Sequence, residues 1–280
     1  MQQIFSNTTL TVNQLIEKID TGELGLPELQ RPFIWKDSKV RDLFDSMMCG
    51  YPIGYLMLWE CPTLEKKKTI GTDTHNYESP KQVIIDGQQR LTSLYAVMKG
   101  KKVINSKYDE KSIVISYCPV KNKFEVGYQA TKKDPEWIYN ISEVFTTSAL
   151  SNLKQHTLPV FDIKANAEEE DVSEIFVRVN SGGVALKQND FILTLLSLYW
   201  DEGRKEIEQF SMESTYPSKD KITSYNQLTE VTAQDVIRVV MAYAFDRARL
   251  KYGYKLLRGA DFDKKGAVDE TLRDQRFDVL

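Results

Sequence analysis

Residues 82–98 read QVIIDGQQRLTSLYAVM, and this stretch decides the fold. Residues 82–85 are a short, mostly β-branched run that is typical of a strand, and apolar residues then recur at helical spacing from Leu91 to Met98. Between the two patterns, Gly87 allows the backbone to turn sharply. A strand, a tight turn and a helix in direct succession point the first amide groups of the helix outward, where the helix dipole favours an anion.

The side chains of this turn suit phosphate chemistry. We expect Asp86 to hold Mg²⁺ directly or through water, because hard cations prefer carboxylate oxygens. Arg90 is the strongest candidate for binding phosphate, because its guanidinium makes paired hydrogen bonds and keeps its charge. Gln88 or Gln89 would orient a water. The alternative is a purely structural turn in which Asp86 caps the helix and pairs with Arg90.

Two other segments carry candidate site residues. Residues 176–183 read FVRVNSGG, in which two glycines end a helical pattern and expose backbone amides next to polar side chains. A second anion-facing loop is expected there, formed by Arg178, Asn180, Gly182 and Gly183. The alternative is an ordinary glycine cap at the end of a helix.

Residues 29–35 read LQRPFIW and follow Glu28. The proline keeps the preceding residue out of the helical region, so Arg31 projects from extended chain. A cation, an amide and aromatic rings in this spacing suit contact with a nucleobase and its phosphate, which makes Gln30, Arg31 and Trp35 candidates for binding DNA. The alternative places Phe33 and Trp35 in the hydrophobic core.

The rest of the chain divides into two parts of different character. Apolar spacing predicts a helix over 12–19, begun by a capping box of Thr11 and Gln14, and a second over 40–47 that ends at Gly50. Strands are expected at residues 55–60, 112–117, 123–128 and 158–163, with a polar loop over 62–80. Helical patterns then dominate, over 172–179, 190–200 and 232–250. We therefore expect an α/β domain over 1–165 and a helical domain over 166–280.

Composition excludes several classes of protein. A net charge of −3 argues against a protein that coats nucleic acid by charge alone, and 41% hydrophobic residues in 280 suffice for a sizeable core. Three widely spaced cysteines fit a reducing cytoplasm better than a disulfide framework. No secretory signal is visible, and the apolar run 191–200 is far shorter than the ~20 residues that cross a bilayer. A cytoplasmic protein with no membrane partner is expected.

Missing motifs exclude further chemistry. The chain has no GxxxxGK[ST] sequence, so it is not a standard P-loop protein. His75 and His156 lack metal-ligand spacing, and each is expected at the surface. Zinc hydrolysis and a histidine-based nuclease are therefore poorly supported.

The three segments LQRPFIW, IDGQQRL and FVRVNSGG together resemble the N-terminal domain of GmrSD-type restriction proteins, in the order that this family shows. The likeness spans about residues 10–199, and the DGQQR segment is its most specific part. It implies an α+β, ParB/sulfiredoxin-like domain with a small mixed sheet, and a nucleotide-dependent sensor that acts against modified or foreign phage DNA. It also implies that Gly87 and the residues around it form the nucleotide site, lined by Arg178 and Asn180, with Gln30 and Arg31 supporting it or touching DNA.

The sequence departs from this family in two places. Full-length relatives carry a C-terminal nuclease with a histidine-centred metal site, but residues 201–280 contain no histidine. Nuclease activity is therefore not expected from this chain alone, and a nuclease would lie beyond Leu280 or in a partner chain. Lys187 stands where relatives often have a hydroxyl residue, which puts the capping of the next helix in doubt.

Three hypotheses stay open at this point. The first is a Mg²⁺-assisted nucleoside triphosphatase, for GTP or another nucleotide, whose turnover regulates a nuclease. In the second, the same pocket holds DNA phosphate or a modified base without turnover. The third is a docking domain, for which the apolar run 191–200 would form an interface. A homo-oligomer is compatible with all three.

Overall fold

The computed structural model describes residues 3–25, 33–60, 81–105, 109–145, 150–167, 171–172, 175, 201–218 and 221–246. The chain forms two compact units, Met1–Phe176 and Val177–Leu280. The predicted loop over 62–80 and the predicted helix over 190–200 lie outside the described residues, as does most of the predicted helix over 172–179.

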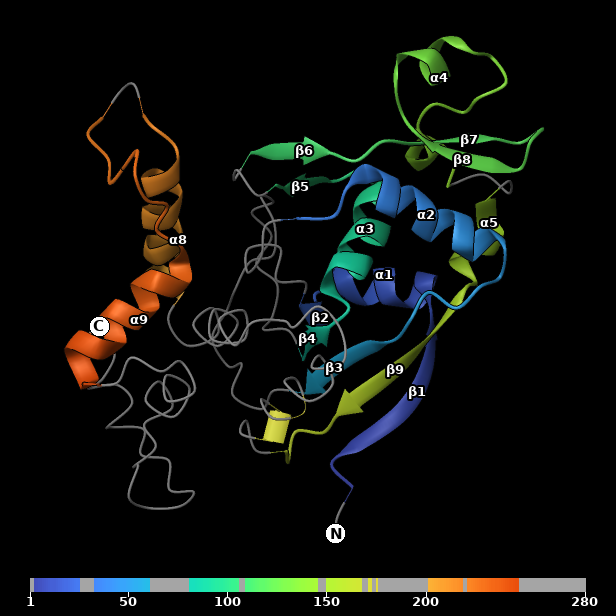
Figure 1. Ribbon diagram of the computed structural model, residues 1–280. Helices are drawn as coiled ribbons and strands as arrows, with labels where there is room; N and C mark the ends of the chain where they lie inside the picture. The colour runs from blue at the N-terminus through green and yellow to red at the C-terminus, as the bar shows by residue number, and fades with distance from the viewer. Residues whose placement is uncertain are drawn as a thin grey trace. The chain divides into compact units, whose positions relative to one another are not determined.

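A mixed five-stranded sheet organises the first unit (Figure 1). Its strands in spatial order are β1 (Phe5–Thr11), β9 (Thr157–Ile163), β3 (Leu56–Glu60), β4 (Gln82–Asp86) and β2 (Leu24–Gly25). The pairs β1–β9 and β3–β4 are antiparallel, whereas β9–β3 and β4–β2 are parallel. The prediction of an α+β fold with a small mixed sheet is confirmed. The closer likeness to ParB and sulfiredoxin stays a prediction.

The neighbouring inner strands β3 and β4 are buried on both faces of the sheet. Leu58 and Ile84 belong to the main hydrophobic core, while Trp59 and Val83, their neighbours along the strands, point to the opposite face and are buried as well. This burial explains why β3 and β4 appear in the sequence as continuous apolar runs rather than as alternating ones.

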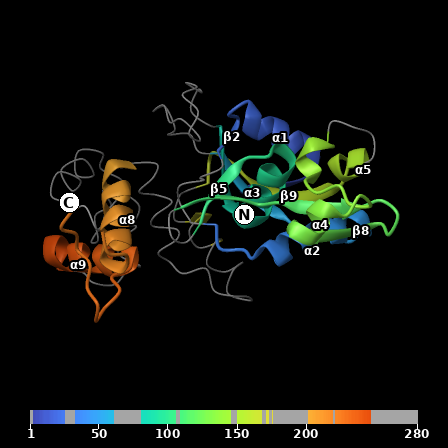
Figure 2. The ribbon, with the colours of Figure 1, turned by 90° about the horizontal axis from the view of Figure 1, so that it is seen from above.

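Three helices cover the core face of the sheet. They are α1 (Val12–Asp20), α2 (Asp37–Met48) and α3 (Gln88–Lys99), and Figure 2 shows α3 between the other two. The capping box predicted for α1 is present, because Thr11 and Gln14 exchange hydrogen bonds between side chain and backbone. Beyond the end of α2, Gly50 has the left-handed conformation (φ +71°) that the prediction of a glycine stop requires.

Shorter elements complete this unit. They are β5 (Lys102–Ile104), β6 (Glu110–Ser112), β7 (Ile115–Cys118), β8 (Lys123–Val126), α4 (Gln129–Lys133), the 3-10 helix η1 (Ile141–Glu143) and α5 (Ser151–Lys154). The predicted hairpin is confirmed as β7–β8, but its first strand was placed too early. Ser112 ends β6, where it pairs with Lys102, and a separate ladder begins at Ile115, which pairs with Val126.

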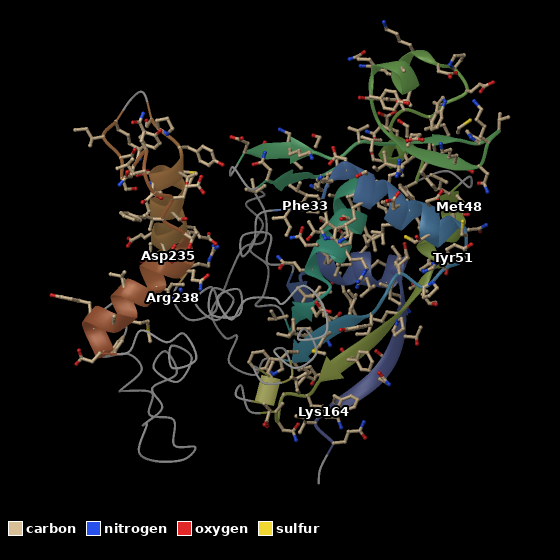
Figure 3. All side chains as sticks on the ribbon, in the orientation of Figure 1. Phe33, Met48, Tyr51, Lys164, Asp235 and Arg238 are labelled. Atoms are coloured by element: carbon tan, nitrogen blue, oxygen red, sulfur yellow. The ribbon has the colours of Figure 1, made fainter. Side chains whose placement is uncertain are left out.

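Phe33 anchors the segment that precedes α2 (Figure 3). Its backbone N–H donates to the carbonyl of Ile104 at 2.6 Å, and it forms an isolated parallel bridge with Asn105. The side chain is buried, so the core interpretation of Phe33 is confirmed. Trp35 is half-buried against the same core, and the Lys39 ammonium lies 4.2 Å from the centre of its ring.

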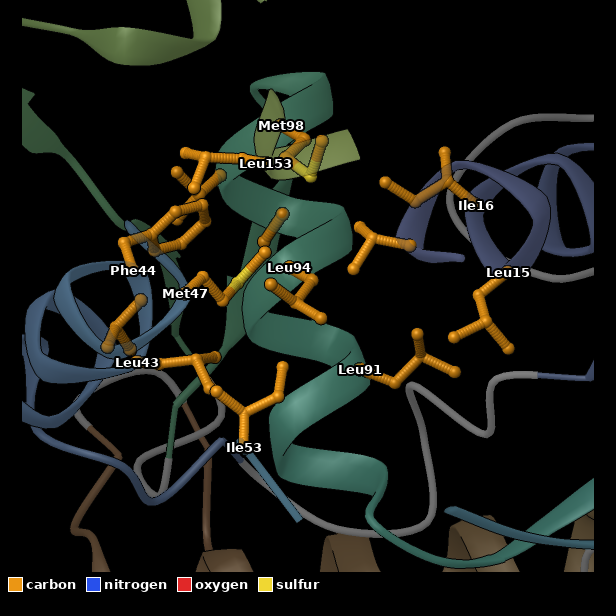
Figure 4. Close-up of a cluster of buried hydrophobic side chains, with 14 of the residues drawn as sticks. Leu15, Ile16, Leu43, Phe44, Met47, Ile53, Leu91, Leu94, Met98 and Leu153 are labelled. Carbon is orange, nitrogen blue, oxygen red and sulfur yellow. The ribbon is translucent and has the colours of Figure 1, made fainter. Parts of the chain in front are cut away.

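Helix α3 passes through the middle of the core. Its residues Leu91 and Leu94 are fully buried. Figure 4 shows them between the apolar side chains of α1 and those of α2, which include Leu15, Ile16, Leu43, Phe44 and Met47. Full burial of a leucine stabilises a fold by about 1.5–3 kcal/mol. The packing therefore fixes α3, and with it the position of the turn that precedes the helix.

The second unit contains two described helices, α8 (Asp201–Thr215) and α9 (Ala233–Phe245). Helix α9 begins at a capping box of Thr232 and Asp235, at the point where the sequence predicts a helix. In α8, Arg204 and Glu208 form a buried ion pair at 2.7 Å. Among the described residues, none of the helices is both long enough and apolar enough to span a bilayer.

Candidate functional site

The predicted turn lies between β4 and α3, and its geometry requires a glycine. Gly87 has a left-handed backbone (φ 92°, ψ 8°), and a Cβ atom built on it would lie 2.4 Å from Cδ2 of Leu56. No side chain at this N-cap position bonds to the first turn of α3. The N-cap residue of α3 is therefore Gly87 and not Asp86. The alternative of a purely structural turn stays a hypothesis.

Arg90 is held at this turn by the chain segment before β3. Its Nη1 donates a hydrogen bond to the backbone carbonyl of Tyr55 at 2.5 Å. Space for the guanidinium exists because residue 54 is glycine: a Cβ atom there would lie 2.6 Å from Nη2 of Arg90. Within the described part of the chain, Arg90 makes this one hydrogen bond. It uses one of the five N–H donors of the guanidinium.

The electrostatics of Arg90 follow from its half-buried position. Burial lowers the pKa of Arg90, while the nearby Asp86 carboxylate and Tyr55 act in the opposite direction. An arginine keeps its charge in proteins even so. Among the described residues, Arg90 and Asp86 are close enough to influence each other but do not form a direct ion pair. A partly desolvated cation that is not neutralised by a bonded carboxylate is suited to attract an anion.

Tyr55 connects Arg90 with Asp86. Burial raises the pKa of Tyr55, and the charge of the nearby Asp86 carboxylate raises it further. The Tyr55 ring packs edge-on against Phe161, with ring centres 5.4 Å apart. Neither Tyr55 nor Gly54 was predicted from the sequence as a site residue. The contact depends on the pairing of β3 with β4, which brings Met57 opposite Asp86 and which no local motif specifies.

Gln89 ties the turn to the segment at Phe33. Its side-chain oxygen accepts a hydrogen bond from the backbone N–H of Ile34 at 3.0 Å, and its backbone carbonyl accepts one from Oγ of Ser93 at 2.7 Å. This hydrogen bond joins two of the three segments in which site residues were predicted, residues 29–35 and the turn at Gly87. That Gln88 or Gln89 orients a water stays a prediction.

Several of the other predicted site residues lie outside the described part of the chain. Outside the described residues lie Gln30, Arg31, Arg178, Asn180, Gly182 and Gly183. The five residues from Asp86 to Arg90 are brought together and are all half-exposed. Trp35 follows the segment that Gln89 holds.

Asp86 is the carboxylate of the described turn that could contact a divalent metal. In the described parts of the chain, His, Cys, Asp and Glu side chains do not gather in groups of three or more that could hold a metal ion. Mg²⁺ commonly uses one or two carboxylates together with phosphate oxygens and waters. Asp86 therefore fits a Mg²⁺ that arrives with a nucleotide better than a dedicated protein metal site.

Comparison with known proteins gives two matches. A family model described as "GmrSD restriction endonuclease, N-terminal domain" matches residues 12–197. An uncharacterised protein of Methanocaldococcus jannaschii is 23% identical over 240 residues, which cover 67% of this chain and 41% of that protein. The matched region thus spans less than half the length of this curated relative. The family match includes both Gly87 and Gly182.

Proposed function

This chain belongs to the family of GmrSD restriction endonuclease N-terminal domains, which places it in a DNA restriction system, and from that premise we propose that it binds and hydrolyses a nucleoside triphosphate as the sensor domain of that system. One observation carries the proposal. The guanidinium of Arg90 is held at a left-handed glycine turn, at the N-terminus of a buried helix and close to the carboxylate of Asp86.

Each part of this arrangement favours a phosphate chain. The N-terminus of α3 carries a partial positive charge, and its N-cap residue, Gly87, has no side chain. Arg90 adds a full positive charge whose position is fixed before a ligand arrives, so little ordering has to accompany binding. When Mg²⁺ is bound with the nucleotide, it supplies charge neutralisation for the phosphates. Asp86 is the carboxylate that would hold it.

The proposal assigns DNA cleavage to another part of the restriction system. Nucleotide turnover in this domain would license a nuclease, located in another region of the protein or in a partner chain, to act on modified or foreign phage DNA. Residues 201–280 contain no histidine for a histidine-centred metal site, in keeping with this division of roles.

Phosphate release from ATP, GTP, CTP and UTP tests the triphosphatase directly. We expect Mg²⁺-dependent release with at least one nucleotide, and a loss of about 10³-fold in Arg90→Ala, the order seen when an arginine that contacts a transferring phosphate is removed. Asp86→Asn should raise the Mg²⁺ concentration that gives half-maximal release. Arg238→Ala is the control, because Arg238 is exposed on α9 (Figure 3), and it should match the wild type. Equal release from wild type and Arg90→Ala would refute hydrolysis at this site.

A further inference from the structure

Three aromatic side chains form a row on the face of the sheet opposite to α1, α2 and α3. The ring of Tyr55 packs edge-on against Phe161, with ring centres 5.4 Å apart, and Phe161 also contacts Phe5, with ring centres 6.3 Å apart. Val160 of β9 belongs to the main hydrophobic core, so Phe161, the next residue along the strand, points to the other face. This aromatic row of Phe5, Phe161 and Tyr55 therefore lies outside the main core.

The aromatic row is only partly covered. Phe161 and Tyr55 are half-buried, and Phe5 is 37% exposed. Met57, which pairs with Phe161, is buried on the same face, and so is Ile163 next along β9. A single exposed aromatic ring is common at a protein surface, but rings in contact with one another leave flat apolar surface for a planar ligand.

One end of the aromatic row lies directly beside Arg90. The backbone carbonyl of Tyr55 accepts the 2.5 Å hydrogen bond from Nη1 of Arg90, while the ring of the same residue begins the row. Tyr55 thus carries the candidate phosphate-binding group on its backbone and a stacking surface on its side chain. A nucleotide joins a phosphate chain to a base through the ribose, so a fixed cation next to aromatic rings matches both parts of the ligand.

We propose that the aromatic row is the base-binding subsite of the nucleotide site, in which the base stacks on Phe161 and Tyr55 while the phosphates contact Arg90 and the first amide groups of α3. This inference rests on the proposed function and deepens it, because it assigns the face of the sheet on which the base lies. Every base has a π-face, so the row supplies affinity rather than selection among bases.

Inorganic tripolyphosphate separates phosphate binding from base binding. Its affinity is measured by isothermal titration calorimetry with Mg²⁺, beside that of whichever of ATP, GTP, CTP and UTP the wild-type protein binds most tightly. In Phe161→Leu, the nucleotide should bind about tenfold more weakly, the order of one base stacked on an aromatic ring. The affinity for tripolyphosphate should stay within about twofold of wild type, because Arg90 and its turn are unchanged, and this also shows that the variant is folded.

Further variants identify the aromatic ring as the cause. Tyr55→Leu keeps the backbone carbonyl that holds Arg90, so it should weaken nucleotide binding and spare tripolyphosphate, as Phe161→Leu does. Phe161→Tyr keeps an aromatic ring and should bind both ligands as the wild type does. Arg90→Ala should weaken the binding of both ligands.

Tyr51→Leu is the matched control. Tyr51 is an exposed tyrosine four residues before Tyr55, and Figure 3 shows it beside α2, away from Lys164, which directly follows β9. Its variant should bind the nucleotide and tripolyphosphate with wild-type affinity.

The two ligands distinguish failure of the subsite from failure of the proposed function. If the wild-type protein binds neither the nucleotides nor tripolyphosphate, the nucleotide site itself is refuted, and the subsite with it. If the wild type binds both and Phe161→Leu keeps its nucleotide affinity, or loses both affinities to the same extent, the base does not stack on the aromatic row and the subsite alone is refuted. A loss of nucleotide binding in Tyr51→Leu equal to that in Phe161→Leu would overturn the subsite as well.

Discussion

Gly54 and Gly50 both have left-handed backbones but differ in what surrounds them. Both lie in the segment between α2 and β3 with left-handed backbones, at φ +96° and φ +71°. A Cβ atom on Gly54 would lie 2.6 Å from Nη2 of Arg90, whereas one on Gly50 meets nothing within 4 Å. The two glycines share a backbone requirement and differ in their relation to the site.

Gly54→Ala should therefore displace the Arg90 guanidinium, while Gly50→Ala should not. We expect nucleotide binding, measured by isothermal titration calorimetry, to weaken about tenfold in Gly54→Ala, a loss of about 1.4 kcal/mol. Both variants should lose about 1 kcal/mol of unfolding free energy from strain in a left-handed backbone. Equal affinities in the two variants would show that the position of Arg90 does not govern binding.

The same residues show how far a sequence specifies this site. The prediction of a strand, a glycine turn and a helix around Gly87 was correct because all the deciding features lie within about ten adjacent residues. Tyr55 and Gly54 were missed because they are distant in the sequence from Arg90, which Tyr55 precedes by 35 positions. That contact arises only when β3 pairs with β4 in one register, and the long polar stretch between these strands gives no hint of it.

At the scale of elements, α3 connects the site with the core. Leu94 is fully buried between α1 and α2, so Leu94→Ala should cost about 3 kcal/mol of unfolding free energy in urea denaturation. Val120→Ala removes a similar apolar group from a side chain that is 79% exposed, and its stability should stay within about 0.5 kcal/mol of wild type. A cost below about 1 kcal/mol for Leu94→Ala would contradict the central position of α3.

The hydrogen bond from Ile34 to Gln89 couples a second segment to the start of α3. Gln89→Leu removes the acceptor, so the amide hydrogen of Ile34 should exchange with solvent at least tenfold faster in hydrogen-exchange NMR, equivalent to the ~1.4 kcal/mol of a typical hydrogen bond. The amide of Phe33 is the internal control, because its bond to the Ile104 carbonyl does not involve Gln89. Acceleration of both amides to the same extent would indicate general loosening instead.

At the scale of the first unit, the elements that bury a regular apolar stripe were predicted and the polar ones were missed. The helices α1 and α2 and the strands β3, β4 and β9 all match their predictions. Strand β1 has the sequence FSNTTLT and shows little apolar alternation, because among the described strands it lies at the edge of the sheet and pairs with β9 alone. Its place is set by a seven-residue ladder with a strand about 150 positions later, which local patterns do not specify.

His156 directly precedes β9 and lies next to the start of α1. Its backbone carbonyl accepts a hydrogen bond from Val12 at 2.9 Å, at the junction of β1 and α1. The prediction of a surface histidine is only partly met, because the residue is half-buried, and within the described residues its Nε2 is buried without a hydrogen-bond partner. Burial lowers the pKa of His156 below its ordinary value near 6.5. The neutral imidazole is therefore the form that the fold accommodates.

This burial predicts how stability depends on pH. As pH falls through about 6.5, the unfolded chain binds a proton at His156 before the folded chain does, so the unfolding free energy declines toward acid. Above this range the histidine is neutral in both states and contributes no slope. We expect urea unfolding, followed by the fluorescence of tryptophans such as the buried Trp59, to lose less stability between pH 7.5 and 5.5 in His156→Gln than in wild type. Between pH 7.5 and 8.5 the unfolding free energies of the two proteins should change in parallel. An identical decline toward pH 5.5 would show that the cost of protonation lies with carboxylates elsewhere in the fold.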